Sequence, residues 1–512
     1  SAASDVYKRQ GICFMIYSIT STLPPQHGGR TKSLLKRNKL ITEHLSTEST
    51  IITTNYNADY PNIIKGFRDK KLINSSIYHE NMYDWLSNHM LFHVPTRKFS
   101  NQPHFTKTRL KIRGLRRVQT KANHFKYYDA HNRLIRHRVY YKNSRVLKAE
   151  NRFDSKSGAL VERQLFNRYG RLHKRIAFDL DTELTLHESF FDTADYLYCE
   201  KFYDCDENNT LHLIKVHRPD QYPKYFKTEK QLMDYYYECR FKENDIVFND
   251  ARLLDKPLMH KSNKTYNVIV LHSTHLKENG KLKGSYKYAL KHPEQLSIII
   301  VFTEKQKEDL VQRYEIEEDN IKVIPHYIDD YSHYHRSFEE KSHFIYIGRF
   351  SHEKQLNHLL SAYQQFLSKG YQTPLVLFGG SDKQQVKQVQ AWIDKFNIND
   401  YVTIKSFTNQ PLIEFSKAIA SLSTSQFEGF GLSIMESLAV GTPVVSYDYN
   451  YGPGEMIVDG VNGYLVEKNN TTQFADKMAQ LMNQRLAQVE LKPQFHTQSA
   501  IASYRDLIQS FK

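Results

Sequence analysis

The fold is decided by the stretch Ser425-Gln426-Phe427-Glu428-Gly429-Phe430-Gly431-Leu432-Ser433-Ile434-Met435-Glu436-Ser437-Leu438-Ala439. Small and apolar residues before it favour a buried strand, the glycines a loop, and the apolar positions after Gly431 recur at helical spacing. Glycines let a backbone approach a ligand, and a helix N-terminus offers N–H groups to an anion. Glu428 precedes the helix and Glu436 lies within it, so one acid is expected near each end of a ligand with phosphates, such as a nucleotide sugar. An ordinary strand–helix connection is the alternative.

The bulk composition limits the class of protein. With 512 residues the chain is too long for one ordinary core, so two or three domains are expected. No run of about 18 apolar residues predicts a transmembrane helix. The formal charge of +15 favours an anionic partner, namely nucleic acid, a membrane surface or a polymer, or else only a soluble surface. No nucleic-acid-binding motif accompanies the charge, so no nucleic acid is expected.

The start of the chain and its cysteines bear on location. Residues 1–10 are polar, lack a signal peptide's apolar core and an initiator methionine, and join a strand-like segment abruptly, so we expect that they are not native sequence. The cysteines are few, scattered and without metal-type spacing, which favours a reducing cytoplasm. They are Cys13, Cys199, Cys205 and Cys239.

The N-terminal part predicts the opening of a doubly wound α/β domain. A strand over residues 14–20 is followed by a loop with Gly28-Gly29 and an amphipathic helix, although a Gly-Gly pair alone is also a plain tight turn. Residues 55–84 are interpreted as helices and loops.

From about residue 105 to residue 216 the pattern changes to short strands with alternating aromatic and polar residues, separated by Asp, Asn and Gly turns. This predicts an antiparallel meander inserted in the first domain. Its Arg, Lys, His and Tyr side chains form either a platform for an anionic acceptor or for self-association, or the ordinary polar face of a sheet. Asp179-Leu180-Asp181 is interpreted as a hairpin turn rather than a metal motif.

The α/β pattern resumes at about residue 226. A strand from Tyr266 to Leu271 ends in His272-Ser273-Thr274-His275, and ligands bind at the carboxyl ends of strands in such sheets. Both histidines are site candidates, and a chance surface pair is the alternative. Metal binding is not expected, because no third ligand is evident nearby.

A second α/β unit begins at His343. Its first strand ends in Gly348-Arg349-Phe350, and Lys354 follows, so two cations are placed where they could clamp a diphosphate. Further strands lead to Gly379-Gly380, to the stretch quoted first, and to Gly441-Thr442-Pro443-Val444-Val445.

Several of these motifs together resemble the family 4 retaining glycosyltransferases of GT-B fold. The likeness rests on Gly348-Arg349-Phe350 with Lys354, on Glu428 to Glu436, on residues 441–445 and on Asn462-Gly463-Tyr464-Leu465-Val466. It covers most of residues 343–485. Within the family, the chain is similar to bacterial wall-teichoic-acid and poly(glycerol-phosphate) α-glycosyltransferases and to glycosyltransferases of serine-rich or serine-aspartate-repeat adhesins. That likeness rests on residues 423–429, 451–453 and 271–275 and on the β-rich insertion.

The resemblance implies a fold of two Rossmann-like doubly wound domains facing a cleft. The expected boundaries are residues 11–104 and 226–335 for the first domain, 105–225 for the insertion, 336–490 for the nucleotide-sugar domain and 491–512 for a helix that packs back on the first domain. It also implies that Arg349 and Lys354 neutralise the donor diphosphate, that Glu436 holds the ribose and that Glu428 faces the sugar.

Other donor contacts follow from the same resemblance. Backbone N–H groups of Gly431, Leu432 and Ser433 would meet the phosphates, and either His272 or His275 would lie by the anomeric carbon. The remaining expected donor-binding residues are Gly28, Gly29, Gly348, Gly379, Gly429 and Phe430. No metal or other cofactor is expected, because cations and a helix terminus would stabilise the leaving group.

The resemblance therefore implies transfer of glucose or N-acetylglucosamine from a UDP-sugar to teichoic acid or to a serine-rich surface protein. The charge favours an anionic acceptor. The charge also allows peripheral association with the inner face of the membrane as an expectation. By analogy with related enzymes, self-association through the insertion is a further one. A non-catalytic GT-B partner subunit that binds the acceptor is the alternative function. A phosphorylase or epimerase is a third, and these classes lack the motif set.

Overall fold

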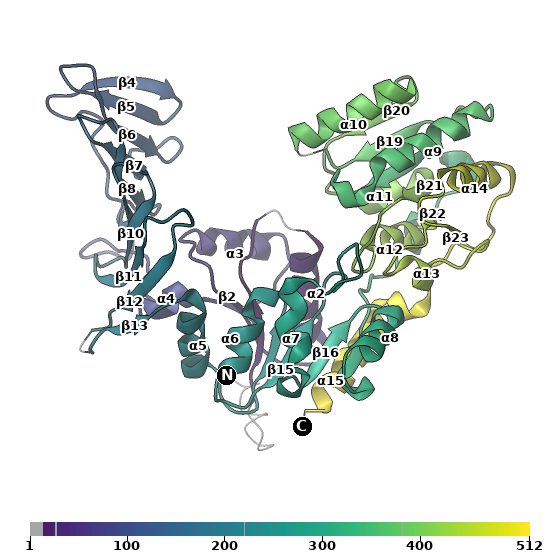
Figure 1. Ribbon diagram of the computed structural model, residues 1–512, viewed down its shortest axis with the longest axis horizontal. Helices are drawn as coiled ribbons and strands as arrows, with labels where there is room; N and C mark the ends of the chain where they lie inside the picture. The colour runs from purple at the N-terminus through teal and green to yellow at the C-terminus, as the bar shows by residue number, and fades with distance from the viewer. Residues whose placement is uncertain (1–13, 26–27, 220, 381, 512) are drawn as a thin grey trace. The chain divides into compact units, whose positions relative to one another are not determined.

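The structure is a computed structural model that describes residues 14–25, 28–219, 221–380 and 382–511 (Figure 1). The suspected non-native start, residues 1–10, and Cys13 lie outside the described residues. The described chain divides into two compact units. The first unit contains residues 28–46 and 266–511, and the second contains residues 14–25 and 47–265.

The second unit contains four parallel strands in the order β14-β1-β2-β3. They are β1 (Ile16–Thr20), β2 (Ser49–Thr53), β3 (Ile77–Asn81) and β14 (Ile246–Asn249). Strands β1, β2 and β14 are buried at every position, as expected for strands covered on both faces. The interpretation of residues 55–84 as helices and loops was wrong for β3, whose middle residues are polar and only partly buried because it ends this sheet.

A ten-stranded antiparallel sheet follows in the same unit (Figure 1). Its strands are neighbours in chain order, which confirms the predicted meander. The strands are β4 (Arg116–Lys121), β5 (His124–Tyr128), β6 (Leu134–Tyr140), β7 (Leu147–Phe153), β8 (Leu160–Phe166), β9 (Leu172–Phe178), β10 (Thr185–Phe191), β11 (Leu197–Tyr203), β12 (Leu211–Val216) and β13 (Lys224–Phe226). Asp179 accepts the backbone N–H groups of Asp181 and Thr182 between β9 and β10, so the predicted hairpin turn is confirmed.

Three arginines of the ten-stranded sheet pair with one buried carboxylate. Glu150 is buried and receives hydrogen bonds from Arg136, Arg138 and Arg152. These guanidinium groups hold the pKa of Glu150 below its usual value, although burial alone would raise it. One buried carboxylate thus pairs with three arginines of the sheet, and the role of the basic face as a platform stays a prediction.

The first unit contains β15 (Tyr266–Val270), β16 (Ile298–Val301) and β17 (Ile321–Val323), which are parallel. It also contains a six-stranded parallel sheet with the order β20-β19-β18-β21-β22-β23. These strands are β18 (His343–Ile347), β19 (Leu375–Phe378), β20 (Val402–Lys405), β21 (Ala418–Ser423), β22 (Val444–Tyr447) and β23 (Gly463–Val466). The strand order reverses between β18 and β21, and ligands bind outside the carboxyl ends of strands at such a point.

Helices complete both units, and a capping residue marks the start of α8 (Glu304–Arg313) in the sequence. Thr303 precedes α8, and its hydroxyl accepts the N–H of Gln306, as a Thr cap does. The second unit has α3 (Tyr60–Asp69), α4 (Met82–Leu86), α5 (Glu229–Arg240) and α6 (Asp255–His260). The first unit has α2 (Gly29–His44), α7 (Lys287–Lys291), α8 (Glu304–Arg313), α9 (Leu356–Ser368), α10 (Lys383–Phe396), α11 (Pro411–Ser416), α12 (Leu432–Ala439), α13 (Pro453–Met456), α14 (Thr471–Asn483) and α15 (Thr497–Gln509).

Short 3-10 helices connect several of these elements. They are η1 (Arg252–Leu254), η2 (Gly284–Tyr286), η3 (Pro293–Gln295), η4 (Glu318–Asn320), η5 (Ser332–Tyr334), η6 (Phe338–Glu340), η7 (His352–Lys354) and η8 (Pro493–Phe495). At the end of the described chain, the ring of Phe511 stacks on Tyr266 with the ring centroids 4.6 Å apart. None of the described helices is long and apolar enough to cross a membrane.

Candidate functional site

The loop of residues 424–431 joins β21 to α12, as the opening stretch predicted. Strand β21 is buried at all positions, and α12 begins directly after the loop. Gly431 caps the helix in the left-handed conformation, with φ of +92°, which only glycine adopts at little cost. The first N–H groups of α12 therefore point out of the carboxyl end of β21, where a helix N-terminus can hold an anion.

Lys354 and Glu428 form an ion pair beside this loop. The Lys354 ammonium contacts Glu428 Oε1, and the Ser425 hydroxyl donates to the same oxygen over 3.2 Å. Both charged side chains are mostly buried, with 14% of Lys354 and 24% of Glu428 exposed. The pair joins the loop after β18 to the loop after β21, the two strands at the reversal of strand order.

Backbone contacts hold these two loops together. The N–H of Gln426 donates to the carbonyl of Glu353 over 2.8 Å, and the Thr424 hydroxyl donates to the carbonyl of Lys354 over 3.0 Å. The geometry of the ion pair is therefore set by the backbone and does not depend on two flexible side chains alone.

Arg349 lies at the same edge but projects into solvent. Its side chain is 78% exposed, and its guanidinium pairs with Glu353 at 3.1 Å. Burial is the main cause of the raised pKa of the Tyr346 phenol. Glu428 raises this pKa further, and Arg349 lowers it. Arg349 and Glu428 thus act on the same buried group. The exposed guanidinium is available to a ligand at the carboxyl end of β18.

Gly348 and Gly379 pack backbone against backbone at the ends of β18 and β19. A Cβ atom at Gly379 would lie 1.8 Å from the carbonyl oxygen of Gly348, and Gly379 has φ of +138°. No side chain can replace hydrogen at this position. The two glycines therefore shape the strand ends beside Arg349.

Two helix N-termini meet in this unit. Gly29 is the first residue of α2 and Leu432 is the first residue of α12. A Cβ atom at Gly29 would lie 3.2 Å from Leu432 Cδ1, whereas one at Gly28 would meet nothing within 4 Å. Each N-terminus carries a partial positive charge, so their convergence favours a ligand with more than one anionic group.

Glu436 lies on α12 in the field of two lysines of α2. Burial raises the pKa of Glu436, and Lys32 and Lys36 oppose this rise. The Lys36 ammonium donates to the carbonyl of Tyr327 and lies 4.4 Å from the centre of that ring. The carboxylate that was predicted to hold a ribose is therefore placed near the N-terminus of α2.

The two candidate histidines have different environments. His272 is partly exposed, and its ring centre is 5.4 Å from that of Phe302. His275 is fully buried, with Tyr451 stacked at 6.3 Å and Tyr314 at 5.8 Å. Burial lowers the pKa of His275 to about 4, so its imidazole is neutral near pH 7.

Gly429 brings the loop against the backbone of His272. A Cβ atom at Gly429 would lie 2.2 Å from the His272 carbonyl oxygen and 3.0 Å from Ser273 Cα. This distance is too short for any side chain, so the glycine allows Glu428 to lie next to the segment that carries His272. Its neighbour Phe430 packs its ring on His326, with the centroids 5.1 Å apart.

The structure thus brings most of the predicted site residues into one region of the first unit, and His275 is the member whose side chain is enclosed. Lys32 and Lys36 lie near Glu436, and His326 lies beside Phe430, but none of the three was a candidate from the sequence. The four-residue spacing of the two lysines, directly after Gly28-Gly29, is the signal that could have found them. No group of three or more His, Cys, Asp or Glu side chains able to hold a metal occurs in the part of the chain that the structure describes.

Known protein families and structures show which class of protein this chain is similar to. Residues 328–497 match the family described as Glycosyl transferases group 1. This region is therefore similar to the group 1 glycosyltransferases, and the resemblance predicted from its motifs is confirmed.

Particular relatives extend the likeness beyond this region. The poly(glycerol-phosphate) alpha-glucosyltransferase of Bacillus subtilis is 26% identical over 91% of this chain and 69% of its own length. The GtfA subunit of the UDP-N-acetylglucosamine–peptide N-acetylglucosaminyltransferase of Streptococcus gordonii is 26% identical over 62% of this chain and 66% of its own length.

A solved structure shares the whole fold. A variant of TarM from S. aureus, in complex with fondaparinux, alpha-GlcNAc-glycerol and UDP, superposes with a TM-score of 0.81. It is 22% identical and covers 97% of this chain and 100% of that chain. The predicted fold class, two parallel α/β sheets of GT-B type with an antiparallel insertion in the first domain, is thereby confirmed.

Proposed function

We propose that this protein transfers glucose or N-acetylglucosamine from a UDP-sugar to a polyol-phosphate polymer of the cell wall, with retention of the anomeric configuration. The observation that supports this most is the Lys354–Glu428 pair, which lies beside the N-terminus of α12 at the reversal of strand order. This arrangement combines a cation, an anion-binding helix end and an acid for a sugar hydroxyl.

The donor is assigned to the carboxyl ends of β18 and β21. Arg349, Lys354 and the first N–H groups of α12 meet the diphosphate, and the second helix N-terminus at Gly29 adds to the positive field. Glu436 accepts hydrogen bonds from the ribose hydroxyls. Glu428 accepts one from the transferred sugar, and its pairing with Lys354 fixes the carboxylate in place.

We assign the position by the anomeric carbon to His272 and not to His275. His272 is partly exposed, and its carbonyl lies against the glycine that follows Glu428. His275 is enclosed by Tyr314 and Tyr451 and cannot reach a substrate without an opening of this packing.

The chemical step breaks the bond between the anomeric carbon and the phosphate oxygen, and the electron pair leaves with UDP. An oxocarbenium-like centre develops on the sugar while negative charge grows on the diphosphate. Arg349, Lys354 and the helix N-terminus stabilise that charge more strongly in the transition state than in the bound donor. The acceptor hydroxyl attacks from the side of the leaving group, and its proton passes to the departing phosphate oxygen.

The proposed acceptor rests on the net charge of the chain and on the names of its relatives. A net charge of +15 favours a polyanion, and the Bacillus relative acts on poly(glycerol phosphate) by its name. A serine-rich protein is the alternative acceptor, since the Streptococcus relative is a peptide glycosyltransferase subunit. We place the reaction in the cytoplasm, because the described cysteines Cys199, Cys205 and Cys239 are free thiols, as is usual in a reducing compartment.

The test measures UDP release from UDP-glucose and from UDP-N-acetylglucosamine, each with poly(glycerol phosphate), poly(ribitol phosphate) or a serine-aspartate-rich polypeptide. Release with one sugar and a polyol-phosphate polymer, lost in Lys354→Ala, is the expected result. Release only with the polypeptide would replace the proposed acceptor. UDP binding without release for every pair would favour the non-catalytic partner subunit, and no UDP binding would overturn the assignment of the donor site.

A further inference from the structure

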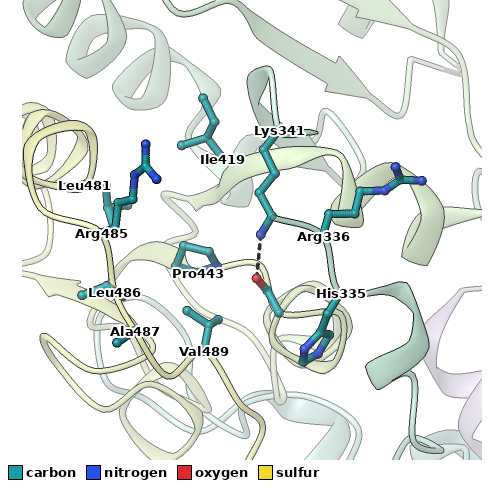
Figure 2. A pocket seen from close by; sticks show the side chains of 11 residues that line it. His335, Arg336, Lys341, Ile419, Pro443, Leu481, Arg485, Leu486, Ala487 and Val489 are labelled. Atoms are coloured by element: carbon teal, nitrogen blue, oxygen red, sulfur yellow. Dashed lines mark hydrogen bonds between the residues drawn. The ribbon is translucent and has the colours of Figure 1, made fainter. Parts of the chain in front are cut away.

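A pocket lies at the amino ends of the strands of the six-stranded sheet, at the opposite end from the donor-site residues. Ile419 is the second residue of β21, and Pro443 directly precedes β22, so this pocket lies at the amino ends of the strands. Glu428 and Arg349 follow the carboxyl ends. The pocket has a volume of about 240 Å³. It is lined by His335, Arg336, Lys341, Ile419, Gly441, Pro443, Leu481, Arg485, Leu486, Ala487 and Val489 (Figure 2).

The polar side chains of this pocket are basic. Figure 2 shows the Lys341 ammonium in the middle of the view, with Arg485 on one side and Arg336 and His335 on the other. No carboxylate occurs among the described residues that line the pocket. The remaining wall is mostly apolar, which strengthens electrostatic attraction because the local dielectric constant is lower than in water.

Lys341 is the best placed of these cations. Its ammonium donates to the carbonyl of Gly441 over 2.7 Å, the dashed line in Figure 2. It donates more weakly to the Thr442 hydroxyl over 3.4 Å. An ammonium has three N–H donors, so one remains for a ligand. Burial lowers the pKa of Lys341 to about 8, and a bound anion would favour the charged form again.

The arginines have partners that a ligand can replace. Arg485 pairs with Glu339, and Arg336 lies 3.9 Å from Glu340. Both carboxylates are more than half exposed, and exposed pairs of this kind contribute only about 0–1 kcal/mol. Arg336 also donates to the Ser416 hydroxyl at the end of α11, and the Lys341 ammonium contacts Gly441, two residues after the end of α12. Both cations thus lie near helix C-termini, where a positive charge is favoured.

We propose that this pocket is an oxyanion-binding site, distinct from the donor site, that takes a phosphate or phosphodiester group between Lys341 and Arg485. The volume is large enough for a tetrahedral oxyanion with several waters, since about 15 Å³ of such cavity volume holds one water. The ligand comes either from free phosphate or from a polymer of phosphodiesters, because the recognised group has the same chemistry. The site does not depend on the transferase reaction, so it stands or falls separately from the proposed function.

The experiment is calorimetric binding to the full chain with the donor site filled by UDP. The probes are inorganic phosphate and a synthetic glycerol-phosphate oligomer, each measured at low and high salt. The variants are Lys341→Met and Arg485→Gln. Lys395→Gln, which removes one exposed charge from α10 in the same unit, is the matched control.

At least one probe should bind beside UDP, and its dissociation constant should rise at least tenfold in Lys341→Met and in Arg485→Gln but stay unchanged in Lys395→Gln. Tighter binding of the oligomer would identify the polymer as the source, and binding of inorganic phosphate alone would identify free phosphate. The proposal is overturned if neither probe binds beside UDP, or if the Arg485→Gln protein binds as the unchanged protein does. Arg485 is exposed, so this variant decides the question even if Lys341→Met does not fold.

Discussion

The ammonium of Lys354 forms an ion pair with the Glu428 carboxylate, 74 positions further along the chain. Lys354→Ala removes a cation from the site where negative charge develops on the leaving diphosphate. We expect turnover to fall at least 100-fold, about 3 kcal/mol of transition-state stabilisation, with a much smaller change in the melting temperature. The rate is measured as UDP release, and thermal unfolding is followed on the same sample.

The control for this variant is Lys369→Ala, which breaks an exposed ion pair with Asp476 at 2.8 Å. It should leave turnover unchanged. If Lys354→Ala turned over as fast as the unchanged protein, the role of Lys354 in stabilising the leaving group would be wrong.

Glu436 gives a prediction about donor affinity. If the carboxylate holds the ribose, Glu436→Gln should weaken UDP binding roughly tenfold, about 1.4 kcal/mol, because two charge-assisted hydrogen bonds become neutral ones. Calorimetry with UDP measures this directly. Glu414→Gln, at a carboxylate of α11 paired with Lys417, is the control and should bind UDP normally. Equal affinity in both variants would remove Glu436 from the donor site.

A substitution at Gly429 tests whether activity needs the close approach of this residue to the backbone of His272. In Gly429→Ala the new methyl group would lie 2.2 Å from the carbonyl oxygen of His272, so one of the two segments must move. Because Glu428 directly precedes Gly429, its carboxylate would move as well, and we expect turnover to fall more than tenfold while UDP still binds. In Gly454→Ala the nearest atom, Asp448 Oδ1, is 3.4 Å away, which is ordinary contact, and activity should be kept. Full activity of Gly429→Ala would show that the approach is not needed.

Substitution of His272 should affect mainly activity, and substitution of His275 should affect mainly stability. His272→Asn should lower turnover with little change in the melting temperature, because its side chain is partly exposed. His275→Asn should lower the melting temperature, because it leaves a gap beside Tyr314 and Tyr451 in a fully buried place. Turnover per folded molecule should change less in His275→Asn than in His272→Asn. The reverse ranking would exchange the two assignments.

Much of the fold could be predicted because its signals are local. The buried strand β21, the glycine loop and α12 have the correct order and period in the sequence, and the aromatic hairpins of residues 105–216 predicted the antiparallel sheet. Strand β3 was missed because its middle residues, Tyr78, His79 and Glu80, are polar on a strand that ends its sheet. Periodicity alone does not reveal such a strand.

The candidate site was predictable as a set of residues but not as a geometry. Arg349, Lys354 and Glu428 could be placed at the ends of strands, and strand ends at a reversal of strand order meet. One sequence contains no signal for which side chains pair, so the Lys354–Glu428 contact and the position of Lys36 near Glu436 could not be foreseen. Nor could it choose between His272 and His275, because the choice depends on the packing of Tyr451, which is 176 positions beyond His275.

The buried His275 makes the stability of the first unit depend on pH. Its folded pKa of about 4 lies below the ordinary value of about 6.5, so the unfolded chain takes up a proton that the folded chain refuses. The stability that follows is complete above pH 6.5 and is lost as the pH falls toward 4. Between pH 7.5 and pH 5 the loss should be about 2 kcal/mol from this group alone.

The measurement is urea unfolding at the two pH values. Fluorescence of Trp392 reports on the first unit, in a Trp85→Phe background that removes the other tryptophan. The loss of unfolding free energy between pH 7.5 and pH 5 should be about 2 kcal/mol smaller in His275→Gln, which cannot titrate, whatever the stability of that variant at pH 7.5. If the two proteins lose the same amount, His275 takes up its proton in the folded state as readily as in the unfolded one, and its enclosure by Tyr314 and Tyr451 does not hold in solution.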